Sequence, residues 1–120
     1  MKRSMWIPAL AAAVCLGGGL IQAADKATVS GEVIDSSCYV KSGAHGGEHS
    51  GCAGGCAKRG VPLALLTDDG KVVMVASAKD GETANALLIE NVAKKVTVEG
   101  SWYERGGAKI FYIEKVTPSK

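Results

Sequence analysis

The chain has 120 residues and a formal charge of +2, which is enough for one domain and not for two. Lys2 and Arg3 carry the whole excess, because removing them leaves 12 basic residues against 12 acidic ones. A neutral domain lacks the basic surface with which proteins bind polyanions. The composition therefore excludes nucleic acid as the expected partner.

Residues 1–23 have the pattern of a secretory signal peptide. Two basic residues precede an apolar stretch, and small residues surround the exit at Ala23. A retained membrane anchor is the alternative, but the run Gly17-Gly18-Gly19 makes a poor spanning helix. We expect a periplasmic or secreted protein without stable membrane insertion after cleavage, and residues 24–120 as its single domain.

Alternating apolar and polar residues predict five strands in that domain. Their expected ranges are 28–34, 61–67, 71–76, 96–103 and 109–116. Asp68-Asp69-Gly70 is a turn that joins the second and third strands as a hairpin. A helix begins at 80–83, and its apolar positions Ala84, Leu87, Leu88 and Val92 form one face.

This order of elements predicts an all-β fold with one helix, a five-stranded OB-like barrel. Its helix lies between the third and fourth strands. Between the first and second strands lies an insert, residues 36–60. From 42 to 60 this insert contains seven glycines and no aliphatic residue larger than alanine. Because such a segment buries little apolar surface, we expect something other than a core to hold it.

The cysteine and histidine residues of the insert are candidates for holding it, as ligands of a metal ion. Cys38, His45, His49, Cys52 and Cys56 lie within 19 residues and include every cysteine and histidine after residue 23. If the chain is helical from His49 onward, the spacings of three and four place His49, Cys52 and Cys56 on one face. Cys38, at the end of the first strand, closes the set. Three cysteines and one histidine form a tetrahedral zinc site, and thiolates equally suit Cu(I).

Two further residues of the insert are weaker candidates. His45 is an alternative ligand or a partner that orients a ligand, and Glu48 can orient an imidazole. Exposed loop positions more often explain a lone histidine or carboxylate.

Disulfide chemistry is the competing interpretation. Cys38 pairs with Cys52 or Cys56, or those two pair with each other, and each choice leaves one thiol over. A spare Cys52 near Lys58 or Arg59 would be an activated thiol with redox chemistry. The histidines favour the metal, since a disulfide does not require them.

A third interpretation uses the aromatic residues. Trp102 and Tyr103 are a possible stacking surface of the kind with which OB folds bind oligonucleotides or oligosaccharides. Neutral charge and export argue against nucleic acid.

The pattern resembles a group of small exported bacterial proteins. Their segment reads Asp-x-x-Cys-Tyr, a glycine-rich spacer, His-x-x-Cys-x-x-x-Cys and Gly-x-Pro. Here it is carried by Asp35, Cys38, Tyr39, His49, Cys52, Cys56, Gly60 and Pro62. The resemblance covers the first half of the chain after residue 23. It implies a purposeful site and no particular reaction.

The sequence thus predicts an exported metal-binding barrel whose zinc or copper ion is held by Cys38, His49, Cys52 and Cys56. Its role is metal handling, or a metal-stabilised surface for another envelope protein. An enzyme is not expected, because a site closed by four protein ligands keeps no open position for a substrate.

Overall fold

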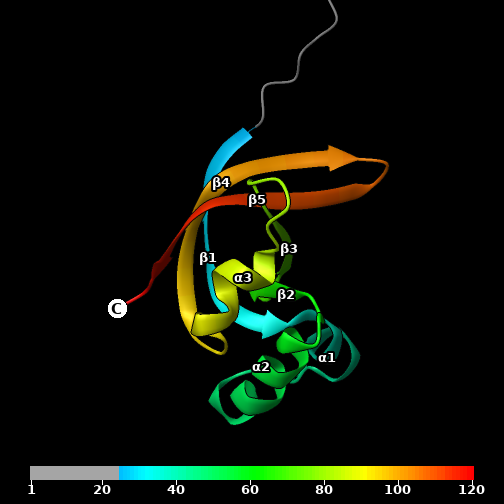
Figure 1. Cartoon of the computed structure of the whole chain (residues 1–120), viewed down its shortest axis with the longest axis vertical. Coiled ribbons are helices and arrows are strands. Elements are labelled where there is room, and N and C mark those ends of the chain that lie inside the picture. Colours follow the sequence, from blue (N-terminus) through cyan, green and yellow to red (C-terminus); the bar gives the residue numbers. More distant parts are fainter. Residues whose placement is uncertain (1–24) are drawn as a thin grey trace, which may run out of the picture.

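The computed structural model describes residues 25–120. The predicted signal segment 1–23 lies outside the described residues. Five strands close into a barrel in the order β1-β2-β3-β5-β4 (Figure 1). Their bounds are Asp25–Asp35 (β1), Leu63–Leu66 (β2), Val72–Ser77 (β3), Lys95–Arg105 (β4) and Ala108–Pro118 (β5). The OB-like barrel is confirmed.

The long first strand decides where the insert emerges. Its residues 25–32 pair with β4, and its residues 32–35 pair with β2, all antiparallel. The one parallel pairing among the described strands joins β3 to β5. Because Asp35 at the end of β1 pairs with Leu63 at the start of β2, the insert leaves and re-enters the barrel at one place.

Inward-facing side chains fill the barrel. Phe111, Leu65 and Val98 are fully buried. Leu88 of the helix Ala84–Leu88 (α3) and two alanines of the insert, Ala53 and Ala57, belong to the same apolar cluster. These three residues close the end of the barrel from which the insert emerges.

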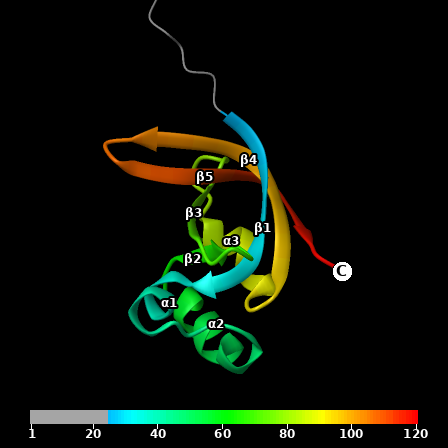
Figure 2. The same cartoon turned by 180° about the vertical axis from the view of Figure 1, so that it is seen from behind.

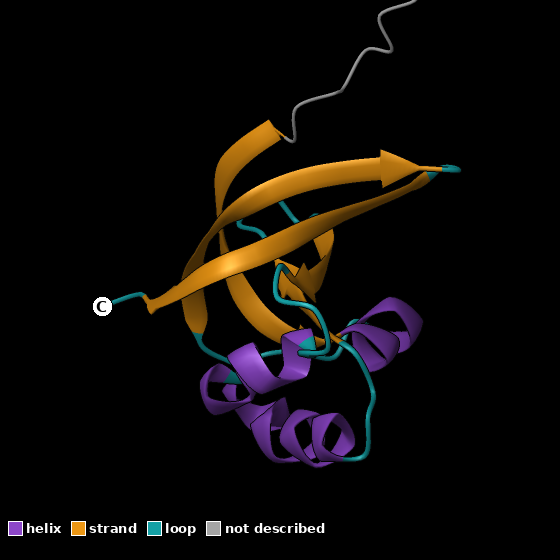
Figure 3. Ribbon diagram, turned by 45° about the horizontal axis from the view of Figure 1, so that its top comes forward, coloured by secondary structure: helices purple, strands orange, loops and turns teal. Residues whose placement is uncertain are grey.

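The expectation of a single helix is wrong. The helices are α1 (Ser36–Ser42), α2 (Ser50–Lys58) and α3 (Ala84–Leu88), with 3-10 turns at Gly47–His49 and Ile89–Asn91. All three α-helices gather at one end of the barrel, with α1 and α2 beyond the strands (Figures 2 and 3). None of the helices in residues 25–120 has the length and apolar character needed to cross a membrane.

Capping residues and small side chains order the glycine-rich insert. Asp35 accepts a hydrogen bond from the backbone N–H of Cys38 and so caps α1, which ends at Gly43 with a φ of 74°. That left-handed conformation is one that glycine adopts without strain. In α2, Ala53 and Ala57 lie four residues apart on one face and are buried. The insert therefore contributes to the core through alanine alone.

The helix α3 is shorter than its apolar periodicity predicts. Thr83 caps it by accepting from the N–H of Ala86. The chain then leaves the helix, because Val92 forms a parallel bridge with Val33 and Ala93 has a φ of 62°. Val92 is buried as predicted, but through an extended segment that leads into β4.

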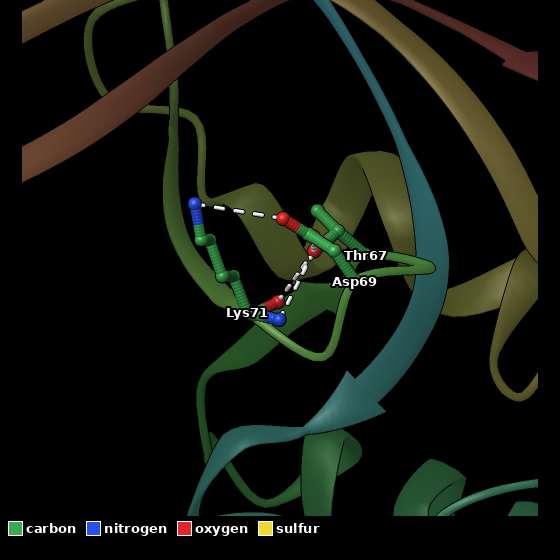
Figure 4. Close-up of polar contacts among 3 residues, drawn as sticks. All are labelled: Thr67, Asp69 and Lys71. Carbon is green, nitrogen blue, oxygen red and sulfur yellow. Dashed lines mark hydrogen bonds and ion pairs between the residues drawn. The ribbon is translucent and has the colours of Figure 1, made fainter.

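The turn between β2 and β3 matches the expected hairpin (Figure 4). The Thr67 hydroxyl accepts from the backbone N–H of Lys71 at 3.1 Å and donates to Asp69. Asp69 also forms an ion pair with Lys71 at 3.5 Å. The Thr67 hydrogen bond, followed by the Lys71 charge, lowers the pKa of Asp69. These groups serve the turn, whose Gly70 has a φ of 80°.

Asn85 joins α3 to the end of the insert. Its Nδ2 donates to the carbonyls of Ala57 (3.1 Å) and Val61 (2.8 Å). Its Oδ1 accepts from the N–H of Leu63 at 2.8 Å. One side chain thus fixes the path from α2 into β2.

Replacing Asn85 by Ala is expected to lower the free energy of unfolding by about 2–3 kcal/mol, since each hydrogen bond contributes about 1 kcal/mol. Urea denaturation measures the loss. Asn91→Ala is the matched control, because that side chain makes no hydrogen bond within residues 25–120 and should change stability by less than about 0.5 kcal/mol. Equal effects of the two variants would contradict the role of Asn85.

Candidate metal centre

Three side chains place their donor atoms within 4.8 Å of one another: Cys38, His49 and Cys52. Cys38 lies in the first turn of α1, His49 directly precedes α2, and Cys52 lies in the first turn of α2. Zinc–sulfur bonds of about 2.3 Å place tetrahedral donors about 3.8 Å apart. The group therefore lies close enough to bind a metal ion after a contraction of about 1 Å.

Two buried atoms near this group have no hydrogen-bond partner. They are Nε2 of His49 and Oδ2 of Asp35, and no other buried side-chain nitrogen or oxygen of residues 25–120 lacks a partner. Leaving a buried polar atom unpaired costs about 1–3 kcal/mol. A cation bound by the group would remove that cost for His49, so the residues present fit a metal.

Cys56 lies beside the donor group and is not a member of it. His49 and Cys56 are seven residues apart, which is about 10 Å along an α-helix. Cys38 closes against the first turn of α2, where His49 and Cys52 are, and the Cys56 sulfur instead accepts a hydrogen bond from Arg59 Nη2 at 3.4 Å. The structure thus brings together three of the four predicted ligands.

Asp35 lies between the thiols and the barrel, and 1% of it is exposed. Burial opposes its ionisation, but the N–H of Cys38, the thiols of Cys38 and Cys56, and the N–H of Ser37 outweigh burial and lower its pKa. Oδ1 takes the Cys38 N–H at 2.9 Å. Oδ2 is buried and has no hydrogen-bond partner among the described residues.

The same carboxylate affects the sulfur atoms. The nearby Asp35 carboxylate, then burial, raises the pKa of Cys38. Burial, then the nearby Asp35 carboxylate and the proximity of Cys52, raises the pKa of Cys56, against an opposing effect of Arg59. Activated thiols have a lowered pKa. The raised pKa of Cys38 and Cys56 therefore argues against an activated thiolate at either residue.

His45 and Glu48 lie outside the donor group. His45 Nδ1 is 3.1 Å from Glu32 Oε2, and its ring meets Tyr39 edge-on at 5.8 Å. Glu32 also accepts from the N–H of Gly46, so His45 helps to fix the loop between α1 and α2. Glu48 is exposed in the 3-10 turn that precedes α2.

Trp102 and Tyr103 point to opposite faces of β4, as successive strand residues do. Trp102 packs edge-on against the buried Phe111, with the Lys109 ammonium 4.7 Å from its ring centre. Tyr103 is 53% exposed and meets Tyr112 edge-on in a different surface hollow. The two rings do not form one stacking surface.

Asp35 is the site residue that the sequence indicates most weakly. Its signal is a helix cap, since an aspartate three residues before Cys38 fits that role. Its complete burial, with Oδ2 left without a partner, depends on long-range packing that no local pattern reveals. Cys38, Cys52 and Cys56 are free thiols in the structure.

Comparisons with family models, with curated proteins and with solved structures found no match for this chain.

Proposed function

We propose that this protein is an exported carrier of a transition-metal ion, held by Cys38, His49 and Cys52. The observation that carries the proposal is the convergence of two sulfur atoms and one imidazole within 4.8 Å, with His49 Nε2 buried and unpartnered. Soft thiolate and imidazole donors suit zinc and copper and disfavour magnesium or calcium.

The position of the group supports handling of the ion over permanent storage. Cys52 is exposed, whereas Cys38 and His49 are partly buried. A ligand at the surface can be exchanged for a donor of another molecule while the other two still hold the ion. The partner in this exchange is another envelope protein, because the pattern of residues 1–23 supports export.

Metal content tests the proposal. We expect about one zinc or copper ion per chain in protein purified without chelator, and loss of the ion in Cys38→Ser. After chelation and denaturation, a chain that has lost its first 23 residues should release three thiols.

The proximity of the Cys38 and Cys52 sulfurs also favours a competing function, a disulfide-stapled interaction domain. Protein without metal and with a single free thiol would establish that function and refute the carrier.

A further inference from the structure

We propose that a hollow on the outer face of β4 and β5 binds a neutral saccharide through Tyr103, Tyr112 and Ser101. The hollow has a volume of 580 Å³, and sites for small molecules usually measure about 300–1,000 Å³. It belongs to the end of the barrel opposite α1 and α2 (Figures 1 and 2), so this binding activity is independent of the metal centre.

The last residues of β4 and the first residues of β5 form a two-stranded arm. Among residues 25–120, β4 pairs with β1 only as far as Trp102, and β5 pairs with β3 only at 111–113. Beyond those points 103–105 and 108–110 pair with each other alone. Alternate residues of a strand share a face. The pairs on the face of the hollow are Ser101–Tyr112, Tyr103–Ile110 and Arg105–Ala108.

Two tyrosines supply the apolar part of the hollow. Tyr103 is 53% exposed and is the one exposed aromatic residue of the range 25–120. Its ring meets that of Tyr112 edge-on, with the ring centres 5.0 Å apart and the planes at 74°. The contact holds both rings, so little side-chain entropy is lost when a ligand packs against them. The negative face of an aromatic ring attracts the C–H groups of a sugar ring, which carry a slight positive charge.

Ser101 supplies a polar group within the hollow. It lines the hollow although it is only 4% exposed. Its hydroxyl makes no hydrogen bond within the described part of the chain and, in contrast to His49 Nε2, is not enclosed by protein. A buried polar group without a partner costs free energy, which a hydroxyl group of a ligand would recover. Because a serine hydroxyl both donates and accepts, it suits such a ligand in either direction.

The rim of the hollow is polar and balanced in charge. Glu104 and Arg105 lie on it and form no ion pair with any described residue. Glu114, also on the rim, is paired with Lys26 at 3.8 Å. The rim therefore offers both acceptors and donors, which sugar hydroxyls require. A polyanion would need a basic surface and an organic cation an acidic one, so the balance favours a neutral ligand.

The test is an NMR titration of the ¹⁵N-labelled protein, expressed from the full-length chain. The probes are three neutral disaccharides: maltose, cellobiose and N,N′-diacetylchitobiose. We expect at least one to bind with a dissociation constant of about 1 mM or lower and to shift the amide signals of residues 101–112. Shifts confined to other strands would place the site elsewhere and overturn the proposal.

Variants identify the groups that bind. Tyr103→Ala should weaken binding by about 10-fold, and Tyr103→Phe, which keeps the ring, should stay within about 3-fold. Ser101→Ala should weaken binding by about 5-fold through the loss of one hydrogen bond. Its urea midpoint should not change, because the hydroxyl has no partner in the described chain. Met74→Ala is the matched control, since Met74 is 41% exposed on β3 and does not line the hollow.

Charged probes decide the class of ligand. Cellobiouronate replaces one hydroxymethyl group of cellobiose by a carboxylate, and choline tests for an aromatic cation site. Both should bind at least about 5-fold more weakly than the best disaccharide. Tighter binding of either, no binding of any disaccharide, or equal effects of Tyr103→Ala and Met74→Ala overturns the saccharide proposal. None of these outcomes bears on the metal carrier, whose ligands lie in the insert.

Discussion

Replacing His49 by Ala is expected to lower metal affinity by about 100-fold or more, because the ion loses one of three donors. The control lies in the same insert. His45→Ala removes the other imidazole, whose contacts are Glu32 and Tyr39, and should leave affinity within about 3-fold. Competition with a chromophoric chelator measures both values.

The same pair of variants reports on stability. Zinc at 100 times its dissociation constant should raise the free energy of unfolding of wild type by about 2.7 kcal/mol. His49→Ala should show no such gain, and His45→Ala should show it in full. Loss of metal binding in His45→Ala with none in His49→Ala would overturn the choice of ligand.

Replacing Gly100 by Ala should destabilise the barrel by about 3 kcal/mol or more, at the upper end of the range for overpacking. A Cβ at Gly100 would lie 1.9 Å from the carbonyl oxygen of Tyr112 and 3.1 Å from Phe111 Cε1. The obstacle is the backbone of the paired strand, at a register shift in the β4–β5 ladder, so no side-chain rotation relieves it.

Gly54→Ala is the matched control for that substitution. A Cβ there meets no atom within 4 Å, and the residue lies inside α2. Alanine in a helix is favoured over glycine by about 0.5–1 kcal/mol, so this variant should be slightly more stable than wild type. Chemical denaturation compares the two, and a Gly100→Ala protein as stable as wild type would contradict the close approach.

The barrel could be predicted because each strand shows its own alternation. Val96 and Val98 point inward while Glu99 points out, and Phe111 and Ile113 point inward on β5. The turn at 67–70 could be predicted from its four consecutive residues, Thr-Asp-Asp-Gly, which are typical of turns. These signals are local. The strands close into a barrel because the first part of β1 pairs with β4 and its last part pairs with β2.

The helices could be predicted only in part. Seven residues of α1 are too few for an apolar periodicity, and its only signals are the cap at Asp35 and the glycine at 43. The apolar periodicity from Ala84 to Val92 does mark buried positions. Its last residue, Val92, is buried in an extended segment that forms a bridge with Val33. The spacing of apolar residues thus predicts which side chains are buried. It does not predict whether a helix or an extended segment buries them.

The candidate site shows the same division. The spacing of His49 and Cys52 predicts their proximity, because one helical turn separates them. Cys56 lies one further turn along the same helical face. The sequence does not show which turn of α2 the thiol of Cys38 approaches. The approach of the Cys38 thiol to His49 and Cys52, in the first turn of α2, makes that choice.

The pairing of Asp35 with Leu63 has a consequence for how such a protein can evolve. The metal-bearing segment is an excursion whose two ends meet on neighbouring strands. It can be lengthened, shortened or exchanged between relatives without altering the register of any strand. A segment that replaces the insert must keep two small apolar residues, like Ala53 and Ala57, that pack against the apolar core at this end of the barrel. The scaffold and its chemistry are thus separable modules, and the site could be grafted onto another small barrel as a unit.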